Sequence, residues 1–381
     1  MAPAGNWRDA PETTYDGGTD MSEAATPNAA VAVVTSDRFV DHVTPPGHPE
    51  RPARAEAMQA VAALWRDRGG RVIVPRAATP DELGRAHDPR YVEAVAATAG
   101  RSVALDPDTC TSPESYEVAR LAAGAAVAAT EWAMGRLEPV GRVGYAFARP
   151  PGHHAERDRA MGFCLFNNIA VAAAHALALG AGRVAIVDYD VHHGNGTQHI
   201  FSRDPRVLYV STHQYPYYPG TGAAGEVGEG DGAGFTLNVP LEAGATDADY
   251  ARVFDVAVLP VLRRFAPELL FVSAGFDADA RDPLAGMRMS TRGFARLTRD
   301  LRDVAEGCCG GRMVLVAEGG YDLRALAEGL ATSLDVTAGT DDGREAPDAG
   351  EGGAGPAWGT RRADEALRTV RAAQRPFWGE L

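Results

Sequence analysis

The pattern of apolar positions predicts a parallel β-sheet covered by helices on both faces. Short runs rich in Val, Ile and Leu recur along the chain, and longer Ala-rich stretches separate many of them. Continuous apolar runs of roughly four to eight residues are typical of strands that are buried on both faces. The runs that predict strands are 30–36, 71–75, 142–148, 183–190, 206–213, 235–240, 269–276 and 312–320. The stretches that predict helices include 113–135, 168–180, 247–265 and 291–306.

The same pattern indicates one α/β domain over residues 31–381, because the strand and helix alternation never restarts with a new composition. Residues 1–30 have little apolar content and predict a flexible N-terminal arm. Residues 339–359 are rich in Gly, Asp and Pro and predict a surface loop within the domain. The helical pattern then returns at 361–378, and we expect this last segment to pack on the body.

Composition narrows the class of protein. The chain has 381 residues, and 37 basic against 51 acidic side chains give a formal net charge of -14. An acidic chain argues against a surface for nucleic acid or anionic lipid. No apolar run approaches the roughly 18 residues of a membrane-spanning helix. Four cysteines without a CxxC pair fit reduced thiols, and we therefore expect a cytoplasmic protein.

Four of the expected strands end in polar motifs that a purely structural role does not need. The motifs are "RPPGHH", "DYDVHHGNG", "SAGFDADARDPLAG" and "AEGGYD". In open parallel sheets, functional groups gather at the carboxyl ends of the strands. We therefore expect these four motifs to form one site at one edge of the sheet.

The motif "DYDVHHGNG" has the composition of a metal site. Residues two apart on a strand share a face, so Asp188, Asp190 and His192 are expected to point the same way. Asp277 ends another expected strand and supplies a further carboxylate. Two carboxylates and one imidazole suit Zn²⁺ or Fe²⁺. A single aspartate here could simply cap a turn, but buried charges at this density need a compensating ion.

Two further motifs offer acid–base chemistry beside that ion. His153 and His154 are neighbours in an extended segment, so their side chains diverge and are better suited to acid–base or electrostatic roles than to holding one ion together. The alternative is a solvated loop. Tyr321 follows two glycines that permit close approach, and its hydroxyl could donate to a developing oxyanion. The alternative for Tyr321 is packing alone.

Taken together in their order, the segments resemble a known family. "HPERPAR", "RPPGHH", "GFCLFNN", "DYDVHHGNGTQ", "STH", "PGTG", "SAGFDA" with "DPL", and "EGGY" are similar to motifs of the histone deacetylase superfamily, in its class II-like and bacterial amidohydrolase branch. The resemblance runs from about residue 31 to the C-terminus. It implies the arginase–deacetylase fold, a three-layer α/β/α domain with a parallel eight-stranded sheet. It also implies hydrolysis of N-acyl amides with zinc.

The resemblance assigns catalytic roles to matching residues. It implies that His154 is the general base and then the acid, and that His153 is a partner histidine oriented by Asp188. It implies that Tyr321 donates a hydrogen bond to the scissile carbonyl. Asn195 falls behind His154, where class I enzymes have an aspartate, and an amide there should make His154 less basic.

The resemblance also implies the binding residues. Asp190, His192 and Asp277 become the zinc ligands. A structural potassium ion is implied at four backbone carbonyls, those of Asp188, Asp190, His192 and Ser211. The side chain of Ser211 is implied as a further ligand. Substrate-tunnel positions are implied at Gly162, Phe163, Tyr218 and Leu284.

The expected function is a zinc-dependent deacetylase that releases acetate from acetyl-lysine or a small N-acetylated amine. One alternative is an acetylpolyamine amidohydrolase, which Leu284 disfavours because a polyamine gate would carry an acidic residue there. Another is a catalytically silent acyl-binding module, which Tyr321 disfavours. The expected partners are the acetylated substrate, no nucleic acid and no membrane, with a homo-oligomer left open.

Overall fold

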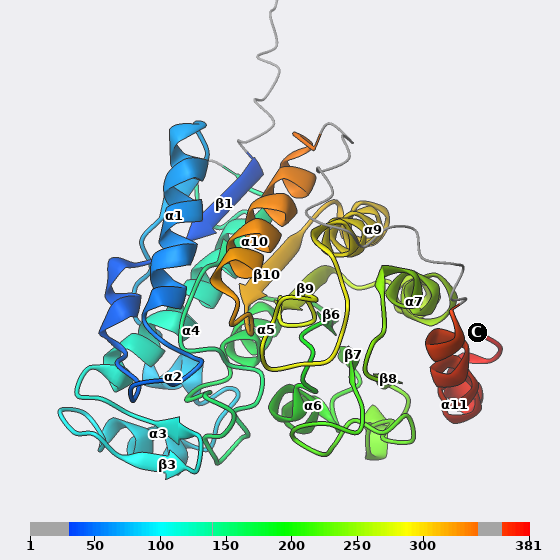
Figure 1. Cartoon of the computed structure of the whole chain (residues 1–381), viewed down its shortest axis with the longest axis horizontal. Helices are drawn as coiled ribbons and strands as arrows, with labels where there is room; N and C mark the ends of the chain where they lie inside the picture. Colours follow the sequence, from blue (N-terminus) through cyan, green and yellow to red (C-terminus); the bar gives the residue numbers. More distant parts are fainter. Residues whose placement is uncertain (1–29, 139, 342–359) are drawn as a thin grey trace, which may run out of the picture.

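The computed structural model describes residues 30–138, 140–341 and 360–381, and its centre is an eight-stranded sheet (Figure 1). All the strand pairs of this sheet are parallel. The strand order is β2-β1-β5-β10-β9-β6-β7-β8. The predicted three-layer α/β class is confirmed. Residues 1–29 of the expected arm and 342–359 of the expected loop lie outside the described residues.

Each of the eight apolar runs forms one strand of the sheet. In chain order the strands are β1 (Val31–Val34), β2 (Arg71–Ile73), β5 (Val143–Ala146), β6 (Val184–Asp188), β7 (Val207–Gln214), β8 (Thr236–Leu241), β9 (Leu269–Ala274) and β10 (Met313–Ala317). Strands β5, β6, β9 and β10 end two or three residues before the predicted runs do. Ladder pairing stops there because the polar motifs leave the sheet, so the residues beyond each strand are free to build a site.

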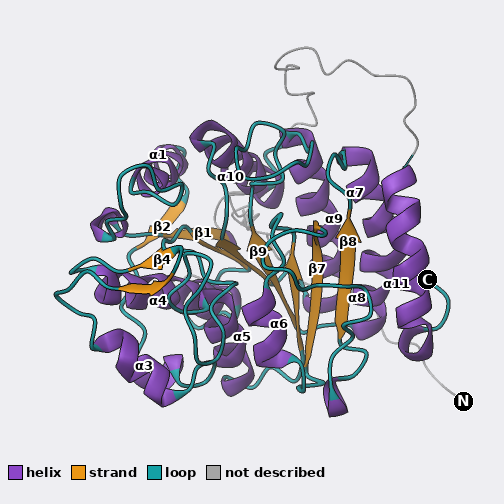
Figure 2. Ribbon diagram, turned by 60° about the horizontal axis from the view of Figure 1, so that its bottom comes forward, coloured by secondary structure: helices purple, strands orange, loops and turns teal. Residues whose placement is uncertain are grey.

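Helices cover both faces of the sheet (Figure 2). On one face lie α1 (Ala53–Asp67), α7 (Asp247–Val253), α8 (Leu259–Phe265), α9 (Thr291–Cys309) and α10 (Leu323–Ala338). On the other lie α3 (Pro89–Ala96), α4 (Ser115–Ala133) and α5 (Asn168–Ala178), with α2 (Pro80–Leu83) beside them. The helix predicted at 247–265 is divided by a π-helical turn at Phe254–Val258. Helix α6 (Asn195–Phe201) follows β6.

Small residues let α4 approach the sheet closely. A Cβ atom on Gly144 of β5 would lie 2.3 Å from the carbonyl oxygen of Ala129 on α4. A Cβ on Gly124 of the same helix would lie 1.8 Å from the carbonyl oxygen of Arg76. Real side chains do not occupy such positions, so the Ala-rich composition of α4 reflects backbone-to-backbone packing rather than helix propensity alone.

The predicted C-terminal helix is present as α11 (Arg361–Trp378) and packs against β8 and α7. The side-chain amide of Gln374, which is fully buried, donates to the carbonyl oxygen of Thr236 over 2.8 Å. The indole of Trp378 donates to the carbonyl oxygen of Gly234 over 2.8 Å. The helix is therefore held by polar contacts to β8 as well as by its apolar side.

A short antiparallel hairpin lies outside the main sheet and has no counterpart among the sequence predictions. Its strands are β3 (Ala104–Asp106) and β4 (Thr109–Cys110). All four cysteines lie in the described part of the chain and all are free thiols, as expected from their spacing. Among the described helices, none combines the length and apolarity that crossing a membrane requires.

Candidate active site

The four polar motifs meet at one edge of the sheet. Strands β5, β10, β9 and β6, which precede them, are four consecutive neighbours in the strand order. Because these strands are parallel, their carboxyl ends lie side by side. This topology places the four motifs side by side at one edge of the sheet, where they were expected to lie.

Asp190, His192 and Asp277 form a buried group with metal-ligand spacing. One donor atom from each lies within 4.8 Å of the other two. The Nδ1 atom of His192 is 3.2 Å from Oδ1 of Asp190 and 3.1 Å from Oδ2 of Asp277. Both aspartates are completely buried, and His192 is nearly so. The structure thus brings together the three residues that were predicted as ligands.

The local reason for this placement differs from the predicted one. Strand β6 ends at Asp188, so strand alternation does not orient the rest of the motif. Instead, the carboxylate of Asp188 accepts the backbone N–H of Asp190 over 3.1 Å, and the carboxylate of Asp190 accepts that of His192 over 2.9 Å. These successive turns, which aspartate favours, replace the strand. The carboxylate of Asp188 points to His153 rather than into the metal-ligand group.

Glycines surround this group where side chains would collide with it. A Cβ on Gly319 would lie 2.0 Å from Oδ2 of Asp277, and one on Gly275 would lie 2.1 Å from Oδ2 of Asp190. The backbone N–H of Gly319 donates to Oδ2 of Asp190 over 2.7 Å, and that of Val191 donates to Oδ1 of Asp277 over 2.9 Å. The carboxylates are therefore fixed by the backbone before any ligand binds.

The electrostatics of the group favour positive charge at its centre. Burial and the neighbouring charge of Asp190 raise the pKa of Asp277 to about 7. Burial disfavours a charged His192, but hydrogen bonds to Asp190 and Asp277 outweigh it and raise the pKa of His192 to about 10. Two buried carboxylates with one imidazole are a donor set that fits Zn²⁺ or Fe²⁺. The residues present thus fit a dication.

The two histidines of "RPPGHH" have unlike partners. Nδ1 of His153 lies 3.0 Å from the carboxylate of Asp188, while Nδ1 of His154 lies 2.8 Å from the amide oxygen of Asn195. Burial opposes charge on His153, yet the carboxylates of Asp190 and Asp188 raise its pKa to about 10. Burial, with the imidazole of His153 nearby, lowers the pKa of His154 well below its usual range. The surroundings thus treat the two rings differently: the carboxylates favour charge on His153, and burial disfavours it on His154.

Aromatic rings surround the histidine and metal-ligand groups. The ring of His154 has its centroid 5.1 Å from that of Tyr218, and the ring of Phe163 is 5.9 Å from that of Tyr321. Burial raises the pKa of Tyr321 well above its usual range, so its hydroxyl stays protonated. The sequence did not identify Tyr217, whose ring stacks on His192 with centroids 5.6 Å apart. Its position directly before the predicted tunnel residue Tyr218 is the sequence feature that could have indicated it.

The remaining predicted tunnel residues also lie in this region. A Cβ on Gly162 would lie 2.4 Å from the ring of His154, so that position requires glycine. Phe163 has a φ of 68°, and its N–H donates to the hydroxyl of Thr109 on the hairpin over 3.0 Å. The half-buried Leu284 accepts a hydrogen bond at its carbonyl oxygen from the hydroxyl of Tyr217.

The residues predicted for potassium lie together at the end of β6. Asp188 is the register partner of Ser211 on β7, and Asp190 and His192 follow in the adjoining loop. The hydroxyl of Ser211 also lies 2.9 Å from Nδ1 of His213. The set is therefore contiguous in space.

A buried ionic network under the site was not predicted. Glu50 is fully buried and accepts two hydrogen bonds from Arg149, at 2.6 and 2.7 Å, and one from Arg54 at 3.1 Å. Burial opposes its ionisation, but the two arginines lower the pKa of Glu50 to about 2. Arg54 also donates to the carbonyl oxygens of Glu318 and Gly320. The network joins the "RPPGHH" and "EGGY" turns.

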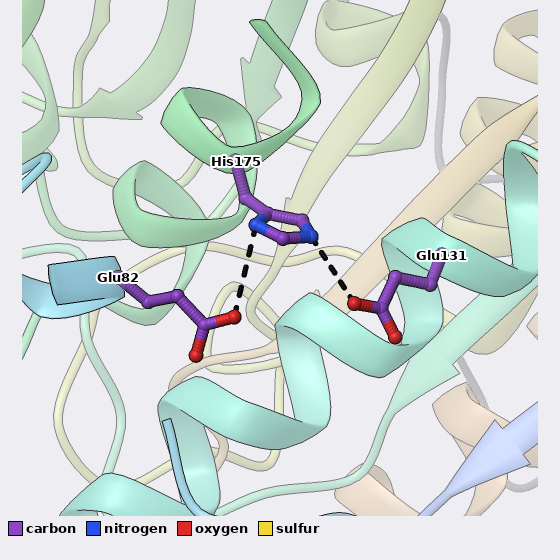
Figure 3. Close-up of side chains that lie close together, drawn as sticks. All are labelled: Glu82, Glu131 and His175. Carbon is purple, nitrogen blue, oxygen red and sulfur yellow. Dashed lines mark hydrogen bonds and ion pairs between the residues drawn. The ribbon is translucent and has the colours of Figure 1, made fainter. Parts of the chain in front are cut away.

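A second group of possible ligands, Glu82, Glu131 and His175, lies on α2, α4 and α5 (Figure 3). Its two carboxylates face opposite nitrogens of the imidazole, at 3.8 and 3.2 Å. Arg76 donates to Glu82 over 2.6 and 2.7 Å, and Nη1 of Arg85 lies 2.6 Å from Nδ1 of His175. Because guanidinium groups already neutralise the carboxylates and hold the ring, this group is a structural ion-pair network.

Comparison with known proteins agrees with the geometry. The histone deacetylase domain family matches residues 48–337. Histone deacetylase 15 of Arabidopsis thaliana is 42% identical over 338 residues, which are 86% of this chain and 59% of that protein. The histone deacetylase-like amidohydrolase of Pseudomonas aeruginosa is 44% identical over 291 residues, 73% of this chain and 74% of that protein.

Two further similarities are to a human polyamine deacetylase and to a solved structure. The polyamine deacetylase HDAC10 of Homo sapiens is 40% identical over 324 residues, 80% of this chain and 46% of that protein. A crystal structure of the HDA15 HD domain superposes with a TM-score of 0.81 at 37% identity, covering 92% of this chain and 95% of that one. A family match over most of the chain, together with a matching fold, decides the assignment: the chain belongs to the histone deacetylase family.

Proposed function

We propose that this chain is a zinc-dependent deacetylase that hydrolyses an N-acyl amide to acetate and a free amine. The observation that supports this most strongly is the meeting of two buried carboxylates and an imidazole within 4.8 Å of one another, beside a histidine pair with unlike partners. Acyl transfer to water needs a polarised carbonyl, a base and a donor to the oxyanion. The site contains a residue for each need.

In this proposal Asp190, His192 and Asp277 hold the ion. A bound zinc ion would polarise the amide carbonyl and lower the pKa of a water molecule at its open position. Asp188 and Ser211, with the backbone at Asp190 and His192, provide the oxygen atoms for a structural potassium ion. All these residues except the nearly buried His192 are completely buried, so the site excludes bulk water at its base.

His154 takes the proton from the attacking water. Its hydrogen bond to the amide oxygen of Asn195 places the proton on Nδ1 and leaves the lone pair on Nε2. A bound dication would lower the pKa of both histidines, and the difference between a carboxylate partner and an amide partner would remain. His153, paired with Asp188, therefore keeps the greater positive character and stabilises negative charge nearby. The protonated His154 then donates to the departing amine.

Tyr321 completes the site as a donor to the carbonyl oxygen when negative charge develops there. Its backbone N–H donates to the carboxylate of Asp282 over 2.7 Å, which fixes the turn that carries it. The guanidinium carbon of Arg54 lies 5.1 Å from the centre of its ring. Both contacts hold the ring in place without using its hydroxyl.

Removal of the metal tests the proposal directly. Acetate release would be measured with an acetyl-lysine peptide, an acetylpolyamine and a trifluoroacetyl-lysine peptide, before and after chelation. We expect turnover to fall to background as the metal content falls, and to return when Zn²⁺ or Fe²⁺ is added back. Undiminished turnover by protein shown to be metal-free would contradict a metal-dependent reaction.

Leu284 is proposed to set the substrate class toward acyl-lysine. It is joined through its carbonyl oxygen to Tyr217, which stacks on His192, so it lies close to the site. An apolar side chain there gives a polyamine no counter-charge. Changing Leu284→Glu should add a charge-assisted contact of order 1.5–3 kcal/mol. The ratio of kcat/KM for acetylspermidine over an acetyl-lysine peptide should therefore rise roughly 10-fold or more.

The uncharged change Leu284→Gln is the matched control, because it alters shape and polarity without adding charge. It should leave the ratio near that of the unmodified protein, which we expect to prefer the peptide. A preference for acetylpolyamines before any change, or an equal shift with Gln and Glu, would remove Leu284 as the gate.

A further inference from the structure

A file of four polar side chains leads from His154 to the protein surface. Nδ1 of His154 is 2.8 Å from Oδ1 of Asn195, and Nδ2 of Asn195 donates to Oε1 of Glu156 over 2.6 Å. Both carboxylate oxygens of Glu156 lie 2.8 Å from Nδ1 of His199. Asn195 and Glu156 are buried, whereas half of the side chain of His199 is exposed.

Two short segments produce this file. His154 and Glu156 are two residues apart in the loop after β5, while Asn195 and His199 are four apart on α6 and so share a helical face. The backbone of Glu156 is fixed on both sides: its N–H donates to the carbonyl oxygen of Arg159, and its own carbonyl oxygen lies 2.9 Å from Nδ1 of His87. The carboxylate is therefore presented to Asn195 by rigid surroundings.

The chemistry of an amide explains why Asn195 needs a third residue. An asparagine side chain can present either its oxygen or its NH₂ group to a neighbour, and the two orientations have nearly the same shape. An ionised carboxylate only accepts hydrogen bonds. With the carboxylate of Glu156 on one side, the NH₂ group of Asn195 must turn to Glu156 and its oxygen must turn to His154.

The orientation of the amide in turn fixes the imidazole. An oxygen that only accepts requires an N–H at Nδ1 of His154, so the lone pair of the neutral ring lies on Nε2. We propose that Glu156 is a positioning residue that, through Asn195, selects the Nδ1–H tautomer of His154. This inference rests on the proposed role of His154 as the base for its catalytic consequence, but not for the tautomer itself.

Two basic side chains face Glu156 at the surface end of the file. The hydrogen bond between His199 and Glu156 outweighs the effect of burial and raises the pKa of His199. The guanidinium of Arg159 lies 3.8 Å from the same carboxylate and is exposed. The carboxylate of Glu156 thus has basic side chains on its surface side and the buried amide of Asn195 on the other.

The change Glu156→Gln replaces an obligate acceptor beside Nδ2 of Asn195 with a group that can also donate. The new amide can accept from His199 and donate to the oxygen of Asn195, which lets Asn195 turn its NH₂ group to Nδ1 of His154. The turned amide gives up its long contact from Nδ2 to the carbonyl oxygen of His154, at 3.4 Å, and His154 then carries its proton on Nε2. We expect zinc content and thermal stability to be kept, and kcat to fall by about 10²-fold, the lower end of what general acid–base catalysis contributes.

A second change should restore the tautomer. An aspartate at position 195 accepts only, so it needs no help from Glu156 to select Nδ1–H. Asn195→Asp alone places two carboxylates about 2.6 Å apart and should be impaired by repulsion. Combined with Glu156→Gln, it meets an amide donor, and the double variant should recover activity beyond either single variant.

The experiment reads the tautomer directly, in the zinc-loaded, full-length protein with ¹⁵N-labelled histidine. Long-range ¹H–¹⁵N correlation spectra distinguish Nδ1–H from Nε2–H, and loss of the signal in His154→Ala assigns it. The unmodified protein and the double variant should show Nδ1–H, and Glu156→Gln should show Nε2–H. Glu229→Gln, which removes a carboxylate from an exposed ion pair with Arg203, is the control for lost charge.

Three results would overturn the inference: Nε2–H in the unmodified protein, Nδ1–H with full kcat in Glu156→Gln, or a double variant no better than either single variant. The first is readable even if Glu156→Gln does not fold. A tautomer that follows the expected pattern in a protein that deacetylates no substrate supports the positioning role and contradicts the proposed function instead.

Discussion

Replacing Asp277 with alanine is expected to strip the metal from the protein and reduce acetate release to background. Asp277 is completely buried and supplies one of three donor atoms, so no neighbouring water or side chain can replace it without rearrangement. Two remaining donors bind a dication far more weakly than three. Metal content by mass spectrometry should fall from about one equivalent per chain to near zero, and turnover should fall with it.

The change Asp279→Ala is a suitable control in the same loop. Asp279 is also buried, but its carboxylate is bonded to Arg281 over 2.8 and 2.9 Å and lies outside the metal-ligand group. Its loss should affect stability and leave the metal bound. If Asp277→Ala retained full metal content and activity, the assignment of the metal-ligand group would be wrong.

The second large effect is expected from Tyr321→Phe, which should lower kcat by roughly 10²-fold or more, as loss of one oxyanion donor does. The ring would keep its contacts with Phe163 and Arg54, so the fold and the metal should be unaffected. Because the contact forms mainly as charge develops on the carbonyl oxygen, KM should change much less than kcat.

Tyr116→Phe provides a matched comparison away from the site. Tyr116 also lies beneath a guanidinium, with the Cζ of Arg120 5.6 Å from its ring centre, and also packs edge-on against a phenylalanine, Phe166. Loss of that hydroxyl should leave kcat unchanged. An unchanged rate in Tyr321→Phe as well would exclude its hydroxyl from the reaction.

The sequence predicted the structure correctly where the local pattern of apolar residues alone determines it. Continuous apolar runs located all eight strands of the main sheet, because parallel strands that are buried on both faces need such runs. Asp190 and His192, predicted as ligands, do lie together, but strand alternation is not the reason, because β6 ends at Asp188. Turns in which an aspartate carboxylate accepts a backbone N–H two residues on, rather than strand alternation, orient the loop after Asp188.

Residues whose roles depend on the order of the strands in the sheet could not be predicted from the sequence. Glu318 directly follows β10, and its carboxylate accepts the backbone N–H of Gly152 over 2.7 Å and of His153 over 3.2 Å. These partners are more than 160 residues away, and they meet because β10 pairs with β5. Nothing in the local pattern says which strands are neighbours. Glu156 was missed for the same reason, since its partner Asn195 begins α6, which follows a different strand.

The contact between α11 and β8 has a consequence for the solution behaviour of the molecule. β8 is the last strand of the sheet, and Phe235 and Thr236 alternate, so the carbonyl oxygen of Phe235 bonds to Tyr209 of β7 while that of Thr236 faces outward. Gln374 occupies that outward carbonyl. An unpaired strand edge is a template for edge-to-edge aggregation. At the opposite end β2 has only three residues, too short to recruit another chain. Helix α11 thus occupies a hydrogen-bonding position on the outer edge of β8, which should disfavour edge-to-edge pairing of two chains there.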